Sequence, residues 1–143
     1  MTVRVRDHMT TKVLTLDAGK RLIVVQEMMG WAHIRHIPVI EKGRRVVGIV
    51  SHRDLLHAAM SSTAVAATVE RRQYLGMIPL ANVMRTDVQT IGPDASIQEA
   101  AVRMREGKIG CLPVVENDKL IGIISEYDLL GIVAALPETA AVT

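Results

Sequence analysis

Short runs of branched apolar residues alternate along this chain with longer segments whose apolar residues recur every three or four positions. In the second half, such a run predicts a short strand over VQTI (88–91), and the stripe that begins at Ile97 predicts an amphipathic helix. Two further strands are expected at CLPVV and KLIGIIS, joined by Asn117–Asp118, residue types that tolerate a tight turn. A last helix is expected over about 125–135. This half therefore has the order β-α-β-β-α.

The same pattern occurs in the first half. Residues 9–56 align with residues 84–130 at an offset of 75, which falls to 74 in the turn between the last two strands. The matched positions include Gly, Pro, Ser and Asp as well as apolar residues, so we interpret the chain as two copies of one unit. The copies differ where the first helix begins. Ser96 has capping-box spacing to Glu99, whereas Arg21 at the matching position is expected to cap its helix less well.

The repeat predicts the fold class and the domain boundaries. We expect an α/β (α+β) protein made of two βαββα repeats, the first over residues 1–60 and the second over residues 81–137. The segment 61–80 joins them and is expected to be a helix that breaks before Pro79. Residues 138–143 are expected to form a flexible tail.

The composition narrows the classes of partner. The 143 residues carry a formal charge of only +2 and include one Trp, two Tyr and no Phe. Nucleic acid is therefore a disfavoured partner, because both its electrostatic footprint and an aromatic platform for bases are missing. Cys111 is the single cysteine, which excludes an internal disulfide and suits a reducing compartment. No apolar run approaches the ~20 residues of a membrane span, so we expect a cytoplasmic protein without a membrane partner.

The residue patterns typical of metal sites and of catalysis are also missing. His33 and His36 are three positions apart, but no Cys or carboxylate stands at ligand spacing, so we expect no metal site. The chain has no P-loop, no GxGxxG and no meaningful Ser/His/Asp set. We therefore expect neither an enzyme nor a bound cofactor.

Two interpretations fit the repeated Gly-x-x-Ser-x-x-Asp motif, in which Ser51 and Ser125 precede a helix and Asp54 and Asp128 lie in its first turn. In the structural interpretation the serine caps the helix and the aspartate complements the helix dipole. In the ligand interpretation the free amides and the hydroxyl bind a phosphate, and the carboxylate accepts ribose hydroxyls. Aspartate is shorter than glutamate and thus a poorer capping-box partner, so its presence in both copies favours the ligand interpretation.

The whole pattern resembles the CBS domain, and two copies in tandem resemble a Bateman module. The features that carry the resemblance are Val-Met near the start, a strand ending in Thr, an Ala/Met helix, Ile-x-x-x-Pro-Val and Gly-Ile-x-Ser-x-x-Asp-Leu-Leu. The resemblance covers nearly the whole chain. It implies a pseudo-twofold, disc-like module that binds AMP, ADP or ATP, or else S-adenosylmethionine or NAD, in clefts between the repeats. Such modules usually regulate an enzyme or a transporter.

The resemblance also implies which residues form each cleft, with both repeats contributing. The first cleft is expected to hold Thr15, Ile34, Arg35 and His36 with Ser125, Glu126, Tyr127 and Asp128. The second is expected to hold Thr90, Ile109, Gly110 and Cys111 with Ser51, His52, Arg53 and Asp54. The aspartates would accept from ribose hydroxyls and the serines would bind phosphate or sugar. Arg35, His36 and Arg53 would counter phosphate charge, and the two isoleucines would contact adenine. Because the second helix start carries Glu126 and no basic residue, the two clefts should differ in ligand preference.

We therefore expect a stand-alone, non-catalytic sensor of adenosine-containing ligands that signals to a regulated protein not identified by the sequence. The alternative is a ligand-independent interaction scaffold whose joining helix over 63–78 carries the binding surface. The helix over 126–136 is apolar on almost every side, too apolar to face water. We expect a homodimer through the helices over 54–60 and 126–136.

Overall fold

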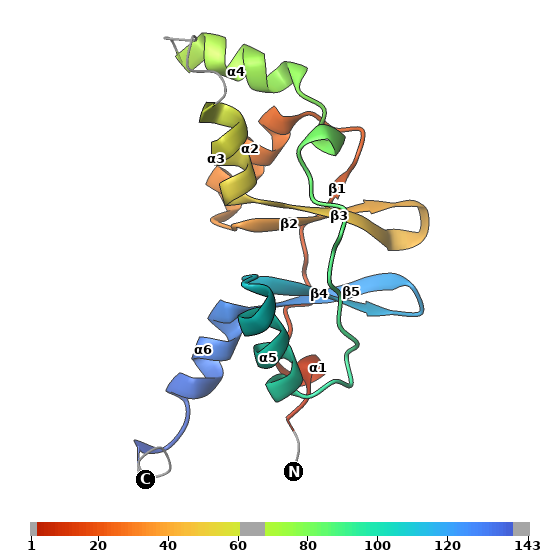
Figure 1. The fold of residues 1–143 in the computed structure, drawn as a ribbon, viewed down its shortest axis with the longest axis vertical. Helices are drawn as coiled ribbons and strands as arrows, with labels where there is room; N and C mark the ends of the chain where they lie inside the picture. The colour runs from red at the N-terminus through yellow and green to blue at the C-terminus, as the bar shows by residue number, and fades with distance from the viewer. Residues whose placement is uncertain (1–2, 61–67, 139–143) are drawn as a thin grey trace. The chain divides into compact units, whose positions relative to one another are not determined.

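A computed structural model of this chain describes residues 3–60 and 68–138 (Figure 1). They form two compact units. The central unit runs from Leu14 to Val88, and the terminal unit combines the residues up to Val13 with those from Gln89 onward. Parts of the expected joining segment (61–67) and of the expected tail (139–143) lie outside the described residues.

The central unit is built on a three-stranded sheet with the order β1-β2-β3. β1 (Leu16–Asp17) is parallel to β2 (His36–Glu41), and β2 is antiparallel to β3 (Arg45–Ser51). The turn between β2 and β3 contains the 3-10 segment η1 (Lys42–Arg44), in which Gly43 has a φ of +74° that suits glycine. The other elements are α2 (Leu22–Ala32), α3 (His52–Met60), α4 (Thr68–Met77) and the 3-10 turn η2 (Leu80–Asn82). α4 packs against α2 and α3 (Figure 1).

The terminal unit contains an antiparallel hairpin of β4 (Cys111–Glu116) and β5 (Lys119–Ser125). Asn117 and Asp118 both have positive φ values, 53° and 63°, so the chain turns at the two residues expected. The helices are α1 (Val5–His8), α5 (Ile97–Gly107) and α6 (Glu126–Ala134). The predicted hairpin and both long helices of the second copy are confirmed.

Each unit has its own apolar core, and a segment distant in sequence completes it. Leu80, which follows α4, is fully buried in the core of the central unit. Val5, 75 positions earlier, is fully buried in the core of the terminal unit. Backbone hydrogen bonds hold both segments, from Leu80 N to Lys20 O at 2.8 Å and from Val5 N to Ala95 O at 2.9 Å. Each core is therefore completed by the segment that leads, in the sequence, into the other copy.

The glycine of the repeated motif allows these leading segments to lie directly against the hairpins. A Cβ atom added at Gly48 would be 2.6 Å from Met84 Sδ and 3.0 Å from Arg85 O. The matching Gly122 is crowded in the same way by Met9, whose Sδ would be 2.8 Å from an added Cβ. Only glycine fits without displacing backbone at such distances. The two glycines therefore fix where residues 84–85 and 9–10 lie.

The first strand of each copy is shorter than predicted. The prediction of a strand over 88–91 is wrong, because within this range only Ile91 forms a bridge, with Val114. In the first copy, the strand that the repeat places over VLTL (13–16), at the offset of 75 from VQTI, begins only at Leu16. Gly92 and Pro93 stop the pairing directly after Ile91, because proline has no N–H with which to continue a ladder.

The remaining helix predictions are confirmed over the residues that the structure describes. Arg21 makes no side-chain cap for α2, whereas Ser96 Oγ accepts from Glu99 N at 3.0 Å at the start of α5. In the joining segment α4 ends at Met77, ahead of Pro79. Within the described ranges, none of the helices has both the length and the apolar character needed to cross a bilayer.

Candidate functional site

The two Ser-x-x-Asp segments form the starts of α3 and α6. Ser51 Oγ accepts a hydrogen bond from Asp54 N at 3.1 Å, and Asp54 Oδ2 accepts from Ser51 N at 2.9 Å. Between Ser125 and Asp128 the same two distances are 3.3 and 2.8 Å. Both helix starts therefore have a reciprocal capping box, in which the serine caps the helix as the structural interpretation predicted and the aspartate also returns a bond.

Aspartate is long enough for this role, contrary to the expectation from sequence. Both aspartates reach back to the N–H of the capping serine. In α5, by contrast, the Glu99 carboxylate makes no return bond to Ser96 among the residues that the structure describes. The choice of Asp over Glu is thus explained by capping and does not by itself indicate a ligand. The carboxylate oxygen that capping leaves unused, Oδ1, is the atom available for other contacts.

In the central unit the residues before Pro38 lie beside the start of α3. His36 pairs with Ser51 across β2 and β3, and Arg35 O accepts from His52 N at 2.7 Å. Ile34, half-buried, packs on the edge of the core. The hairpin therefore brings the predicted basic residues and the capping serine to one end of the same sheet.

The terminal unit repeats this arrangement with different side chains. Cys111 pairs with Ser125 across β4 and β5, and Gly110 O accepts from Glu126 N at 2.9 Å. Ile109 packs on the edge of that core. The backbone geometry is thus shared by the two units, while the charge near the helix start is not.

The predicted site residues differ in exposure. Five are exposed to solvent: Arg35, His52, Arg53, Glu126 and Tyr127. One, Cys111, is buried. The others are half-buried: Thr15, Ile34, His36, Ser51, Asp54, Thr90, Ile109, Gly110, Ser125 and Asp128. Thr15 directly precedes β1, and Thr90 directly precedes the bridge at Ile91.

Arg85 is a residue near the site that the sequence interpretation missed. Its Nε lies 3.4 Å from Asp54 Oδ1, and the side chains of Arg85 and Asp54 are 60% and 11% exposed. The residue directly follows Met84, which the repeat aligns with Met9. Comparing the next pair of positions, Arg85 and Thr10, would have revealed a charge present beside one copy only.

Cys111 is a buried thiol rather than a reactive one. Burial raises the pKa of its thiol from 9.0 to about 12, and the negative charge of Glu126 adds to the rise. The thiolate is the reactive form of cysteine. Among residues 3–60 and 68–138, no three His, Cys, Asp or Glu side chains gather in a way that could hold a metal ion.

The raised pKa of Cys111 predicts a pH-dependent stability. Below pH 9 the thiol is protonated in both the folded and the unfolded chain, so its contribution to the free energy of unfolding is fully present. Between pH 9 and about 12 only the unfolded chain loses the proton, so the free energy of unfolding should fall by up to ~1.4 kcal/mol per pH unit. Denaturant unfolding of wild type and Cys111→Ala at pH 8, 9 and 10.5 tests this. The Ala variant should lose less stability over that range, and parallel profiles would rule out the effect.

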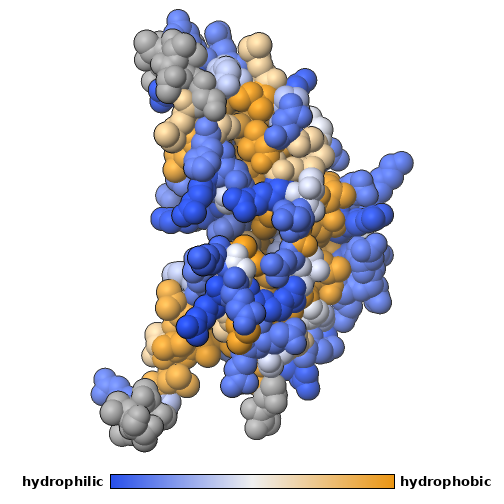
Figure 2. Space-filling model, viewed as in Figure 1, coloured by the Kyte–Doolittle hydropathy of each residue, from blue (hydrophilic) through white to orange (hydrophobic). Residues whose placement is uncertain are grey.

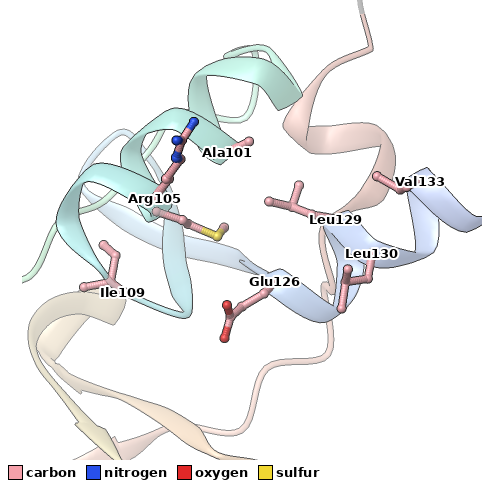
Figure 3. A pocket seen from close by; sticks show the side chains of 8 residues that line it. Ala101, Arg105, Ile109, Glu126, Leu129, Leu130 and Val133 are labelled. Atoms are coloured by element: carbon pink, nitrogen blue, oxygen red, sulfur yellow. The ribbon is translucent and has the colours of Figure 1, made fainter. Parts of the chain in front are cut away.

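α5 and α6 enclose an apolar groove of about 380 Å³ in the terminal unit (Figure 3). Leu129 points from α6 toward α5 in this groove. Leu130 and Val133, farther along α6, are 65% and 63% exposed, and Figure 2 shows the apolar surface along this helix. In the central unit the matching helices α2 and α3 are covered by α4, whose Leu75 is fully buried. The terminal unit has no such cover among its described residues.

Comparison with known proteins identifies the repeats. The CBS domain matches residues 5–61 and 80–135. The CBS domain-containing protein YhcV of Bacillus subtilis is 30% identical over 125 residues, which make up 87% of this chain and 81% of that protein. The homoserine O-acetyltransferase of Methanococcoides burtonii is 36% identical over 126 residues, 87% of this chain. This chain spans only 23% of the length of that enzyme.

Solved structures share the fold of the two units. A proposed acetoin utilization protein (AcuB) from Vibrio cholerae has a TM-score of 0.78 and 37% identity, and the match covers 94% of this chain and 92% of that one. The CBS domain pair of protein MJ0100, in complex with 5′-methylthioadenosine and S-adenosyl-L-methionine, has a TM-score of 0.80 at 18% identity. This match covers 94% of this chain and 98% of that one. CBSX2 in complex with AMP has a TM-score of 0.80 at 23% identity, and the match covers 95% of this chain and 99% of that one.

Proposed function

Because this chain belongs to the CBS-domain family, we propose that it is a non-catalytic regulatory module that binds adenosine-containing ligands. AMP, ADP and ATP are the first choice, and S-adenosylmethionine and NAD are the alternatives. The module would signal energy or metabolite state to a regulated protein. The match to homoserine O-acetyltransferase does not favour catalysis, because it involves less than a quarter of that enzyme.

The observation that carries this proposal is the carboxylate oxygen left open at the start of α6. Oδ2 of Asp128 takes both bonds from Ser125, from N at 2.8 Å and from Oγ at 3.1 Å. Oδ1 makes no hydrogen bond or ion pair among the described residues. A carboxylate oxygen beside a half-buried serine is suited to accept a ribose hydroxyl. The similar folds solved with AMP and with S-adenosyl-L-methionine support an adenosine ligand.

The other predicted residues have roles that follow from their chemistry. Arg35 and Arg53 are exposed cations that suit phosphate, and Ile34 and Ile109 offer apolar surface for adenine. The division of these residues into two clefts, each shared by both repeats, stays a prediction.

Calorimetric titration with AMP, ADP, ATP and S-adenosylmethionine tests the proposal. We expect at least one to bind with a dissociation constant below ~1 mM. Asp128→Asn keeps an acceptor oxygen for Ser125 N but removes the charge, so it should weaken the ligand that binds there by about tenfold or more. Asp118→Asn, in the exposed turn of the same hairpin, is the matched control and should leave affinity unchanged. If neither these four ligands nor NAD binds wild type, the proposal is wrong.

The uncovered α6 surface favours a second candidate function, a ligand-independent interaction scaffold. From the sequence, the binding surface of such a scaffold was expected on the joining helix over 63–78. In the structure α4, which forms part of that segment, buries Leu75 in the core of the central unit. Thermal unfolding separates the two candidates. A ligand at a hundredfold excess over its dissociation constant should stabilise a sensor by ~2.7 kcal/mol, whereas the melting temperature of a scaffold should not change.

We also propose that the chain forms a homodimer through α3 and α6. Leu56 and Met60 on α3 are exposed, as are Leu130 and Val133 on α6. Apolar surface of this kind on two matching helices is typical of a protein interface. The orientation of the two copies stays open to experiment.

A further inference from the structure

The two aspartates differ in what their outer oxygen contacts. Oδ1 of Asp54 lies 3.4 Å from Arg85 Nε, in an ion pair whose carboxylate is nearly buried and whose guanidinium is exposed. Oδ1 of Asp128 has no such partner in the part of the chain that the structure describes. The two helix starts share the reciprocal capping box, and Ser125 Oγ also donates to Asp128 Oδ2 at 3.1 Å. The ion pair is therefore a property of the central unit.

The backbone places position 85 beside Asp54, so the difference lies in the side chain alone. Arg85 and Ile49 exchange two backbone hydrogen bonds, both of 2.9 Å. In the terminal unit Thr10 and Ile123 exchange the same two bonds, of 2.8 and 2.9 Å. Threonine at position 10 has no cation to offer a carboxylate. A single residue in an equivalent position thus decides whether the aspartate is paired.

The surroundings of the two helix starts also differ in charge. Near Asp54, Arg35, His52 and Arg53 are exposed. The repeat places Gly110, Glu126 and Tyr127 at the matching positions. The first turn of α3 therefore carries the cation Arg53 where the first turn of α6 carries the carboxylate Glu126 and Tyr127.

We infer that Arg85 is a specificity-determining residue that makes the α3 start select phosphorylated over unphosphorylated adenosine ligands. This inference rests on the proposed function. A ribose whose hydroxyls donate to both oxygens of Asp54 competes with Arg85 for Oδ1. With adenosine the displaced guanidinium exchanges its carboxylate partner for water. With a nucleotide a phosphate replaces the carboxylate as the partner of the guanidinium, so only the uncharged ligand loses the ion pair.

Substitution of Arg85 by the residue of the other unit tests the inference. Both proteins to be compared carry Asp128→Asn, which weakens ligand binding at the start of α6. Adenosine, AMP and ATP are titrated into the protein with Arg85 and into the protein with Arg85→Thr. The substitution should weaken AMP and ATP by about tenfold or more and should tighten adenosine. The ratio of nucleotide to nucleoside affinity therefore falls. Because Arg85 is exposed, the melting temperature of the unliganded protein should change little.

A reciprocal variant provides the matched control. Thr10→Arg in an Asp54→Asn background should raise the preference of the α6 start for AMP over adenosine. The inference is overturned if Arg85→Thr leaves the preference of the α3 start for AMP over adenosine unchanged while AMP still binds. The proposed function then stands. If adenosine, AMP and ATP all fail to bind wild type and both Asn variants, the adenine-nucleotide form of the proposed function is wrong, and the inference falls with it.

Discussion

Replacing Leu80 with alanine should lower the free energy of unfolding by about 2–5 kcal/mol. Leu80 is fully buried in the core of the central unit, although in the sequence it directly precedes the second repeat. The loss combines the transfer of a buried side chain with the cavity left behind. Urea unfolding of the wild type and the variant, monitored by circular dichroism, measures it.

Leu14→Ala is the matched control for this prediction, because it removes the same atoms from a side chain that is 37% exposed. It should cost well under half as much. Equal losses in the two variants would show that the segment after α4 is not part of the central core.

Leu130→Glu should convert a dimer into a monomer. Leu130 is 65% exposed on the apolar surface of α6, and a carboxylate buried in an apolar interface without a partner costs several kcal/mol. Light scattering at micromolar concentration should give about twice 15.6 kDa for wild type and 15.6 kDa for the variant. Since Leu130 lies at the surface of the folded chain, the circular dichroism spectrum should be unchanged.

Val102→Glu is the control for the interface, since Val102 is also exposed but does not line the groove between α5 and α6. It should remain a dimer. A wild-type protein that is already monomeric, or a Leu130→Glu variant that remains dimeric, would contradict the proposed interface.

The parts of the fold that the sequence predicted well depend on nearby residues. The turn at Asn117–Asp118 follows from two residue types that accept positive φ, and α5 follows from an apolar stripe behind a capping serine. The capping role of Asp54 could also have been predicted, because an aspartate side chain is long enough for it. Asp54 lies three positions after the residue whose N–H it binds.

The parts that the sequence did not predict depend on contacts between distant segments. The pair formed by Arg85 and Asp54 spans 31 positions. Val5 and Leu80 lie in segments whose periodicity says nothing about which core they enter. The short first strands have the same origin, because their pairing depends on a distant partner strand and not on their own apolar residues alone.

The way in which the leading segments complete the cores decides how this protein is best divided for experiments. A fragment ending at residue 60 would include Val5 but lack Leu80, and would therefore carry an anchor for one core while missing part of the other. A fragment from Leu14 to Val88 contains every element of the central unit in one stretch. The terminal unit has no such continuous fragment, because α1 must be joined to the chain after α6. A circular permutant opened between Val13 and Leu14, with a linker between the original ends, would make both units continuous.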